Sequence, residues 1–224
     1  MKVAFLCEGH SEYDSLVKAI PRSGCNNFEF LSTWDSVPIL QPDRVYIYRH
    51  NYKGVGKIRK EYLNFSKKLI DEAGYEKVFI WFDNESLLPV CDYARRQREL
   101  IGGRYIDKME LLISVQDLEN WYLSNNDILG RLLNQVIDET YLTSRGVPNF
   151  LTEDNVDILN AKSILYRLKI NTEVECYPKA KLACRFFSLV DTNLDFSSTL
   201  LVFKFFLKSF RFDVVKLSSK FLVL

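Results

Sequence analysis

Acidic side chains follow three apolar runs of the sequence, and their number points to metal chemistry. Glu8 and Asp83 come at the ends of two such runs, and Glu119 follows the third within a few residues. Carboxylates that gather within a few ångströms repel one another and raise each other's pKa, which a divalent cation relieves. Several hard oxygen ligands suit Mg²⁺ or Mn²⁺ rather than zinc. Two such ions could clamp a phosphodiester, one activating water and the other stabilising the leaving oxygen.

Three additional acids stand near these positions, and each has a simpler explanation as well. Glu12 lies about one turn into the helix expected after Glu8, where the helix dipole favours a negative charge. Asp117 stands where another helix would begin, so we interpret it as a helix cap. Glu85 follows Asp83 closely, and a single acid after a strand is commonly a cap or a solvated loop residue. The joint arrangement at three strand ends is harder to explain in this way.

Strands and helices are expected to alternate over the first half of the chain, and this order must position the acids. Apolar runs rich in β-formers predict strands at 3–6, 28–31, 44–48, 77–82 and 111–115. Helical spacing of apolar residues predicts a helix from Ser11 onward and helices over 54–74 and 90–101. This alternation predicts an α/β fold with a mainly parallel sheet flanked by helices. Such a sheet binds ligands beyond the carboxyl ends of its strands.

The pattern changes after about residue 125. A helix is expected over 128–141, a loop over 143–154, and further helices over 161–168, 178–190 and 200–207. We therefore expect an α/β core over 1–124 and a C-terminal helical extension over 125–224 that packs on it.

Composition excludes several classes of protein. The 224 residues are 47% hydrophobic and 26% charged, which is ordinary for a globular chain and excludes disorder. The net charge is +1, so nucleic-acid binding would have to come from a local basic patch. Five widely spaced cysteines without a CxxC pair argue against a zinc knuckle or a secreted disulfide framework. Apolar runs are far shorter than a spanning helix needs, so we expect a cytoplasmic protein with no membrane partner.

Two basic stretches are candidates for nucleic-acid binding. The first runs over 49–60 and contains Arg49, Lys53 and Lys57 with interleaved tyrosines and glycines. The second contains Arg95 and Arg96. Either stretch could hold a phosphate backbone through its side chains. A solvated helix surface explains the first stretch equally well, and charge on a helix surface is the commoner explanation of the second.

Several segments resemble those of a known family, the TOPRIM domains. The segment 8–12, with sequence EGHSE, resembles the EGxxE signature in the form used by OLD-family nucleases. Asp83-Asn84-Glu85 resembles the DxD element. The segments 114–121, 160–165, 177–183 and 209–212 resemble later motifs of small standalone bacterial TOPRIM-like proteins, which often occur near mobile or defence genes. The resemblance covers nearly the whole chain.

This resemblance implies a TOPRIM fold, which is Rossmann-like, and Mg²⁺- or Mn²⁺-dependent nuclease chemistry, with a role in defence against mobile DNA. Glu8, Asp83 and Lys179 would be catalytic, and Lys179 would oppose the transition-state charge. By motif position the metal ligands would be Glu8, Glu12, Asp83, Glu85 and Glu119. The expected partners are a nucleic acid and an ATPase or other defence-system protein.

Two alternatives stay open at this stage. Glu85 stands where the DxD element has a shorter aspartate, which favours a non-catalytic accessory subunit that acts beside an ATPase or effector. A receiver-like signalling domain with Asp83 as phosphoacceptor is a third interpretation. It lacks the adjacent acid pair expected after the first strand.

Overall fold

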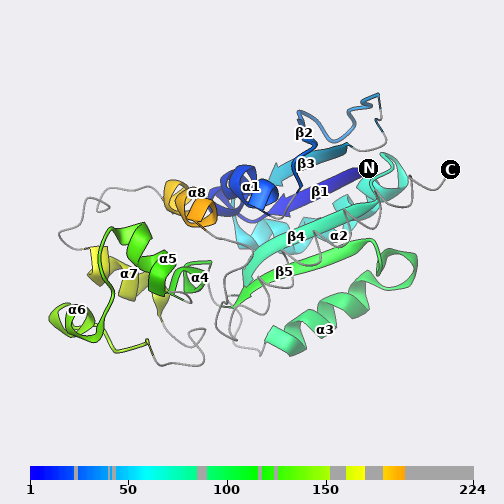
Figure 1. The fold of residues 1–224 in the computed structure, drawn as a ribbon. Coiled ribbons are helices and arrows are strands. Elements are labelled where there is room, and N and C mark those ends of the chain that lie inside the picture. The colour runs from blue at the N-terminus through cyan, green and yellow to red at the C-terminus, as the bar shows by residue number, and fades with distance from the viewer. Residues whose placement is uncertain are drawn as a thin grey trace.

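The centre of the molecule is a five-stranded sheet in which all strands are parallel, in the order β2-β3-β1-β4-β5 (Figure 1). The computed structural model describes residues 1–22, 25–39, 41, 44–84, 90–115, 118–123, 126–151, 160–169 and 179–189. The strands are β1 (Lys2–Cys7), β2 (Phe28–Leu31), β3 (Val45–Asn51), β4 (Lys77–Asn84) and β5 (Met109–Val115). The predicted α/β class with a parallel sheet is confirmed.

The central strand β1 is buried along its whole length, which explains its continuous apolar sequence. Successive side chains of a strand point to opposite faces. Val3 and Phe5 accordingly belong to one apolar cluster, and Ala4 and Leu6 belong to the other. A parallel strand covered on both faces needs apolar residues at every position.

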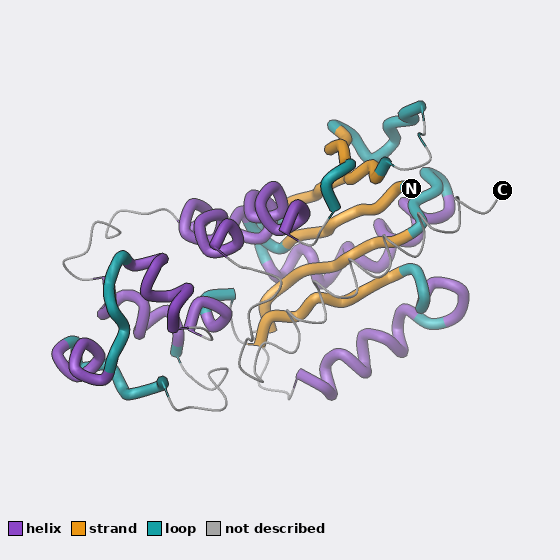
Figure 2. Tube along the Cα trace, in the orientation of Figure 1, coloured by secondary structure: helices purple, strands orange, loops and turns teal. Residues whose placement is uncertain are grey.

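Helices cover both faces of the sheet (Figure 2). On one face α1 (His10–Arg22) packs against α8 (Lys179–Leu189), and the two lie side by side in Figure 1. On the other face lie α2 (Val55–Asp71) and α3 (Val90–Ile101), joined by a 2.7 Å hydrogen bond from the Tyr62 hydroxyl to Gln97 Oε1. The sheet is thus a middle layer between two helical layers.

The described residues beyond β5 are mainly helical, as predicted. Beyond β5 come α4 (Asn120–Leu123), α5 (Asn126–Leu133), α6 (Glu139–Ser144) and α7 (Ala161–Lys169), which gather beyond the carboxyl ends of the strands in Figure 1. Their apolar side chains join the cluster beneath α1, so one continuous core reaches from β1 to α8. The helix predicted over 200–207 lies outside the described residues. None of the helices in the described ranges combines the length and apolar character that crossing a bilayer requires.

The prediction of one helix over 128–141 is wrong, because the chain breaks there into α5 and α6. Asn134 adopts a left-handed conformation with φ 56°. The Gln135 N–H returns to the Gly130 carbonyl at 2.9 Å, which closes α5. The Asp138 carboxylate then caps α6 by accepting the Tyr141 N–H at 2.7 Å. Apolar spacing continues across this break, so periodicity alone did not reveal it.

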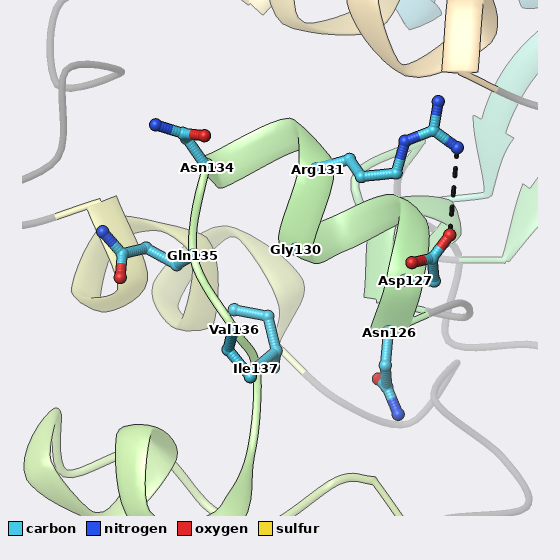
Figure 3. A pocket seen from close by; sticks show the side chains of 8 residues that line it. All are labelled: Asn126, Asp127, Gly130, Arg131, Asn134, Gln135, Val136 and Ile137. Atoms are coloured by element: carbon cyan, nitrogen blue, oxygen red, sulfur yellow. Dashed lines mark ion pairs between the residues drawn. The ribbon is translucent and has the colours of Figure 1, made fainter.

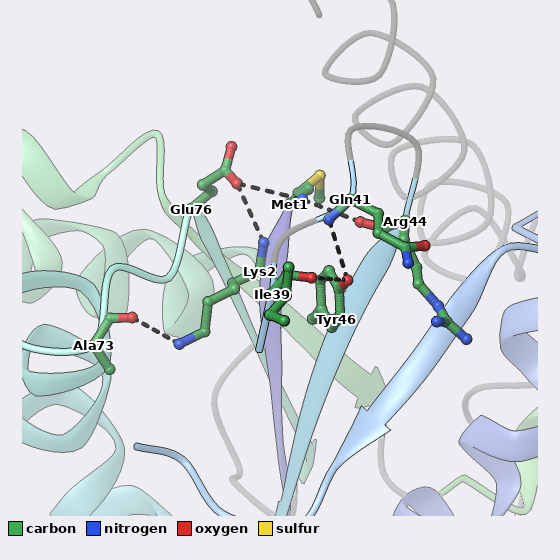
Figure 4. Close-up of polar contacts among 8 residues, drawn as sticks. All are labelled: Met1, Lys2, Ile39, Gln41, Arg44, Tyr46, Ala73 and Glu76. Atoms are coloured by element: carbon green, nitrogen blue, oxygen red, sulfur yellow. Dashed lines mark hydrogen bonds and ion pairs between the residues drawn. The ribbon is translucent and has the colours of Figure 1, made fainter. Parts of the chain in front are cut away.

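The amino edge of the sheet is tied together by complementary polar contacts (Figure 4). The Met1 ammonium donates to the Arg44 carbonyl at 3.1 Å and lies 4.0 Å from the Glu76 carboxylate. Glu76 also accepts the Lys2 backbone N–H at 3.2 Å. The buried Lys2 side chain donates to the Ala73 carbonyl at 2.9 Å. The two ammonium groups at this edge, of Met1 and Lys2, are therefore paired with a carboxylate or with backbone carbonyls.

Candidate acidic site at the carboxyl edge of the sheet

Glu8 and Asp83 meet at the carboxyl edge because they end neighbouring parallel strands. The register of β1 and β4 places Cys7 beside Trp81. The Glu8 N–H donates to the Trp81 carbonyl at 2.9 Å, and the Glu8 carboxylate accepts the Asp83 N–H at 2.9 Å. Two residues 75 positions apart in the sequence are thereby joined directly. The parallel-sheet argument anticipated this meeting.

Glu12 adds a second carboxylate from the first turn of α1. It is only 4% exposed, and its Oε2 accepts the Gly9 N–H at 3.1 Å. This bond resembles the one by which an early helical carboxylate satisfies a free N–H at a helix start. A Cβ at position 9 would lie 3.2 Å from Glu12 Oε2, so glycine at this position lets the carboxylate approach the backbone.

The neighbouring carboxylates add to the effect of burial on Glu12. The pKa of Glu12 is raised from 4.5 to about 7, first by burial and then by the charges of Glu8 and Glu119, against the lowering effect of backbone N–H groups. Burial also raises the pKa of the Tyr122 hydroxyl on α4, and Glu119, Glu12 and Asp83 add to that effect. Charges of acids that follow three different strands therefore act on the buried Tyr122.

The chemistry of this donor set fits a hard divalent cation, because its groups are carboxylate oxygens that repel one another. The positions of these side chains, however, do not form a ready metal site. Within the described ranges, no three Asp, Glu, His or Cys side chains are placed to hold one metal ion. Glu8 and Glu12 each direct an oxygen to a backbone N–H instead. The predicted ligand Glu85 and the neighbouring Asp117 lie outside the described residues.

The predicted basic residues divide into two groups. Lys53 and Lys57 are exposed where the chain passes from β3 into α2, at the carboxyl edge. Arg95 and Arg96 are exposed on α3, and Arg95 pairs with Asp92 at 2.8 Å. The side chain of Lys179, which begins α8, is not among those described.

Arg49 is half-buried and packs against two aromatic rings. Its guanidinium stacks 4.4 Å from the Tyr13 ring centre and 4.0 Å from that of Phe30. It also donates to the Tyr13 carbonyl at 3.0 Å. These contacts join α1 to β2 and β3, so this arginine has a packing role, and its predicted contact with nucleic acid stays a prediction.

Sequence reasoning did not single out Arg59, which reaches the acidic edge from α2. Its guanidinium donates to the Asp83 carbonyl at 3.3 Å and lies 6.0 Å from the Phe82 ring centre. The only sequence signal was membership in the basic stretch 49–60. Its place between two buried positions of the helix, Ile58 and Tyr62, gave no further indication.

A separate pocket of about 640 Å³ opens at the end of α5 (Figure 3). It contains the ion pair of Asp127 with Arg131 at 3.8 Å. The other lining residues are Asn126, Gly130, Asn134, Gln135, Val136 and Ile137. None of Glu8, Glu12, Asp83 or Glu119 lines this pocket. It is therefore distinct from the acidic edge.

The fold and its edge define the chain as an α/β protein with an all-parallel sheet whose carboxyl end gathers acidic side chains. Comparison with protein-family models, with curated proteins and with solved structures finds no match for this chain. The TOPRIM resemblance therefore stays a prediction that depends on the motifs.

Proposed function

We propose that the chain is a divalent-metal-dependent phosphodiester hydrolase, a nuclease of the TOPRIM type, that acts at the carboxyl edge of its sheet. The observation that carries the proposal is the direct bond between the Glu8 carboxylate and the Asp83 backbone, beside a Glu12 whose pKa is raised. Perturbed carboxylates at the carboxyl end of a parallel sheet are typical of functional sites. The motif resemblance adds the reaction class.

In this proposal Glu8, Glu12, Asp83 and Glu119, together with Glu85 by motif position, would hold Mg²⁺ or Mn²⁺ after the Glu8 and Glu12 carboxylates turn from the backbone N–H groups they now accept. The ion would supply Lewis-acid activation of water and neutralise charge on the leaving oxygen. Residues of the chain itself hold the backbone around the acids in position. The hydrogen bond from the Gly9 N–H to Glu12 fixes the first turn of α1. Lys179 by motif position opposes the negative charge of the transition state.

The direct test is metal-dependent cutting of plasmid and single-stranded DNA. The wild-type protein should cut with Mg²⁺ or Mn²⁺ and should be inactive in EDTA, and Asp83→Ala should abolish cutting. Asp107→Asn is the matched control, because Asp107 is an exposed acid in the turn that precedes β5 at the opposite edge. Cutting by Asp83→Ala at the wild-type rate would show that the site is assigned wrongly.

A second candidate is a non-catalytic subunit that acts beside an ATPase or a defence-system effector. The observation that favours it is that Glu8 and Glu12 both engage backbone N–H groups, so their carboxylates already have partners without an ion. Titration calorimetry with Mn²⁺ separates the two candidates. Absence of Mn²⁺ binding favours the subunit, whereas binding that Asp83→Asn removes favours the nuclease.

The proposed biological role is defence against mobile DNA, and its support is the resemblance to proteins found near defence genes. Cells that express the chain should reduce plaque formation by a susceptible phage, and cells that express Asp83→Ala should not. Equal protection by both would separate the role from the nuclease activity.

A further inference from the structure

A row of three cations lies along the carboxyl edge, and its first member is Arg59 at the end of β4. Arg59 donates to the Asp83 carbonyl at 3.3 Å, and the N–H of the same residue is bound by Glu8 at 2.9 Å. Asp83 therefore connects a guanidinium on one side with a carboxylate on the other. The guanidinium approaches over Phe82, whose ring belongs to the apolar cluster beneath α2.

Lys53 is the second member, and it is held at the end of β1. The N–H of Tyr52 donates to the Cys7 carbonyl at 2.9 Å, and the N–H of Gly54 donates to the Glu8 carbonyl at 2.8 Å. Lys53 lies between them in a left-handed conformation with φ 59°, which is uncommon for a residue with a side chain. Its own N–H is satisfied by Asn51 Oδ1 at 2.8 Å. The backbone is thus fixed while the lysine side chain is exposed.

Lys57 is the third member, and it lies near the end of β3. Its N–H donates to the Gly54 carbonyl at 3.2 Å, which places it in the first turn of α2. Because β3 ends at Asn51 and α2 begins at Val55, the first turn of α2 lies near this strand end. The charge of Lys57 also contributes, after the larger effect of burial, to the lowered pKa of His50 near the end of β3.

The three cations accordingly follow three strands that are neighbours in the sheet, β3, β1 and β4. Neighbouring strands are about 4.8 Å apart, so the row extends over roughly 10 Å. The acids lie toward the opposite face. Alternation along β4 turns Asp83 to the side of Trp81, which lies in the cluster beneath α1, and Glu12 is on α1 itself. The edge therefore has a cationic side and an acidic side.

We propose that the row formed by Lys53, Lys57 and Arg59 binds the phosphate backbone of a nucleic-acid strand and positions one phosphodiester beside Glu8 and Asp83. The second part of this statement rests on the proposed nuclease function. A row of cations suits successive phosphates, and an arginine guanidinium is always charged and more weakly hydrated than an ammonium, which suits phosphate recognition. Contacts of this kind position a strand without reading its sequence.

The test is binding of a fluorescein-labelled twelve-nucleotide oligothymidylate, followed by fluorescence anisotropy in EDTA from 50 to 200 mM KCl. Each lost phosphate contact should lower the slope of log affinity against log salt by about 0.7 and weaken binding roughly three- to fivefold at 100 mM KCl. We expect this result for Arg59→Gln and for Lys57→Gln. Arg59→Lys should keep the slope, because it keeps the charge.

Lys108→Gln is the matched control. Lys108 is exposed in the turn before β5, at the amino edge, and its replacement removes the same charge far from the row. Its salt slope should equal that of the wild type. If Arg59→Gln does not fold, as its circular dichroism melt would show, the exposed Lys53→Gln and Lys57→Gln carry the test.

The proposal is wrong if the wild-type chain does not bind the oligonucleotide, if the row variants keep the wild-type slope, or if Lys108→Gln lowers it equally. Failure of the nuclease function gives a different pattern, in which the row variants lose binding while the wild-type protein cuts nothing with Mg²⁺ or Mn²⁺. Conversely, loss of cutting in Asp83→Ala together with unchanged binding by the row variants would reject the proposed role of the row and leave the nuclease proposal standing.

Discussion

The two edges of the sheet are built on opposite electrostatic principles. At the amino edge the Met1 ammonium lies beside Glu76, and the Lys2 ammonium donates to backbone carbonyls. At the carboxyl edge the like charges of Glu8 and Glu119 act on the buried Glu12. The first arrangement stabilises the fold, whereas the second opposes it whenever the acids are ionised.

The difference indicates which edge is available for chemistry. A folded chain tolerates a cluster of like charges where the remaining structure overdetermines it, and such departures from local stability concentrate at functional sites. At the amino edge the Met1 ammonium and the Glu76 carboxylate instead carry opposite charges. Removing a charge should therefore stabilise the carboxyl edge and destabilise the amino edge. Four predictions examine this contrast.

The largest expected effect is a pH-dependent loss of stability at the carboxyl edge. An acid whose pKa rises on folding favours the folded state when it is protonated, so the free energy of unfolding should fall as pH rises from 4.5 through about 7 and stay lower above that. The shift corresponds to about 3 kcal/mol at most. Glu12→Gln should remove this loss, measured by urea unfolding in EDTA at several pH values.

Glu99→Gln on α3 is the control for this experiment, since Glu99 is exposed. Its pH profile should follow that of the wild type. Parallel profiles for Glu12→Gln and the wild type from pH 4.5 to 8 would contradict the burial of a mutually repelling carboxylate.

The second effect is stabilisation of the same edge by a cation. A ligand that binds only the folded state at a hundred times its Kd stabilises by about 2.7 kcal/mol. Mn²⁺ should therefore raise the Tm of the wild type, and the rise should be much smaller for Asp83→Asn. An equal rise in Tm for both proteins would mean that Mn²⁺ acts elsewhere on the molecule.

The third effect concerns the amino edge and has the opposite sign. Lys2→Met keeps an apolar stem but removes the donor to the carbonyls of Ser36 and Ala73 and the cation 4.5 Å from the Tyr75 ring centre. We expect a loss of about 2 kcal/mol in the free energy of unfolding, because two part-buried carbonyls lose a partner. Lys108→Met, at an exposed site of the same edge, should change it by less than about 0.5 kcal/mol. Equal stability of the two variants would show that the Lys2 contacts are dispensable.

The sequence predicted those parts of the fold that depend on local pattern. The helix over 90–101 ends where glycines with positive φ follow it, and the buried strands appear as apolar runs. The meeting of Glu8 and Asp83 follows from any sheet in which their strands are parallel neighbours. The break at Asn134 was missed because it depends on a backbone turn that apolar spacing does not record.

The positions of the basic side chains depend on the tertiary structure and could not be predicted from the sequence pattern. The strand order places β3 between β2 and β1, and only this order brings Lys57, Lys53 and Arg59 to consecutive strand ends. Arg49 and Arg59 belong to the same basic stretch of the sequence. Arg49 nevertheless packs between aromatic rings, whereas Arg59 reaches the acidic edge. The direction of a carboxylate toward a backbone N–H is a matter of side-chain rotamer, which spacing does not specify.

The smallest effect tests how closely the carboxyl edge is packed around its charge. Gly9→Ala places a Cβ 3.2 Å from Glu12 Oε2, so the carboxylate must shift and weaken its bond to the Gly9 N–H. Alanine otherwise stabilises by about 0.4–1 kcal/mol through the unfolded chain, as expected at Gly56, where a Cβ meets nothing within 4 Å. In a Glu12→Ala background the clash is absent, and Gly9→Ala should stabilise as Gly56→Ala does. In the wild type it should be neutral or destabilising, which gives a coupling energy of about 1 kcal/mol in a double-mutant cycle. The same effect of Gly9→Ala in both backgrounds would mean that the carboxylate of Glu12 is not held against this turn. The contrast between the two edges would then no longer be supported by the contact of Gly9 with Glu12.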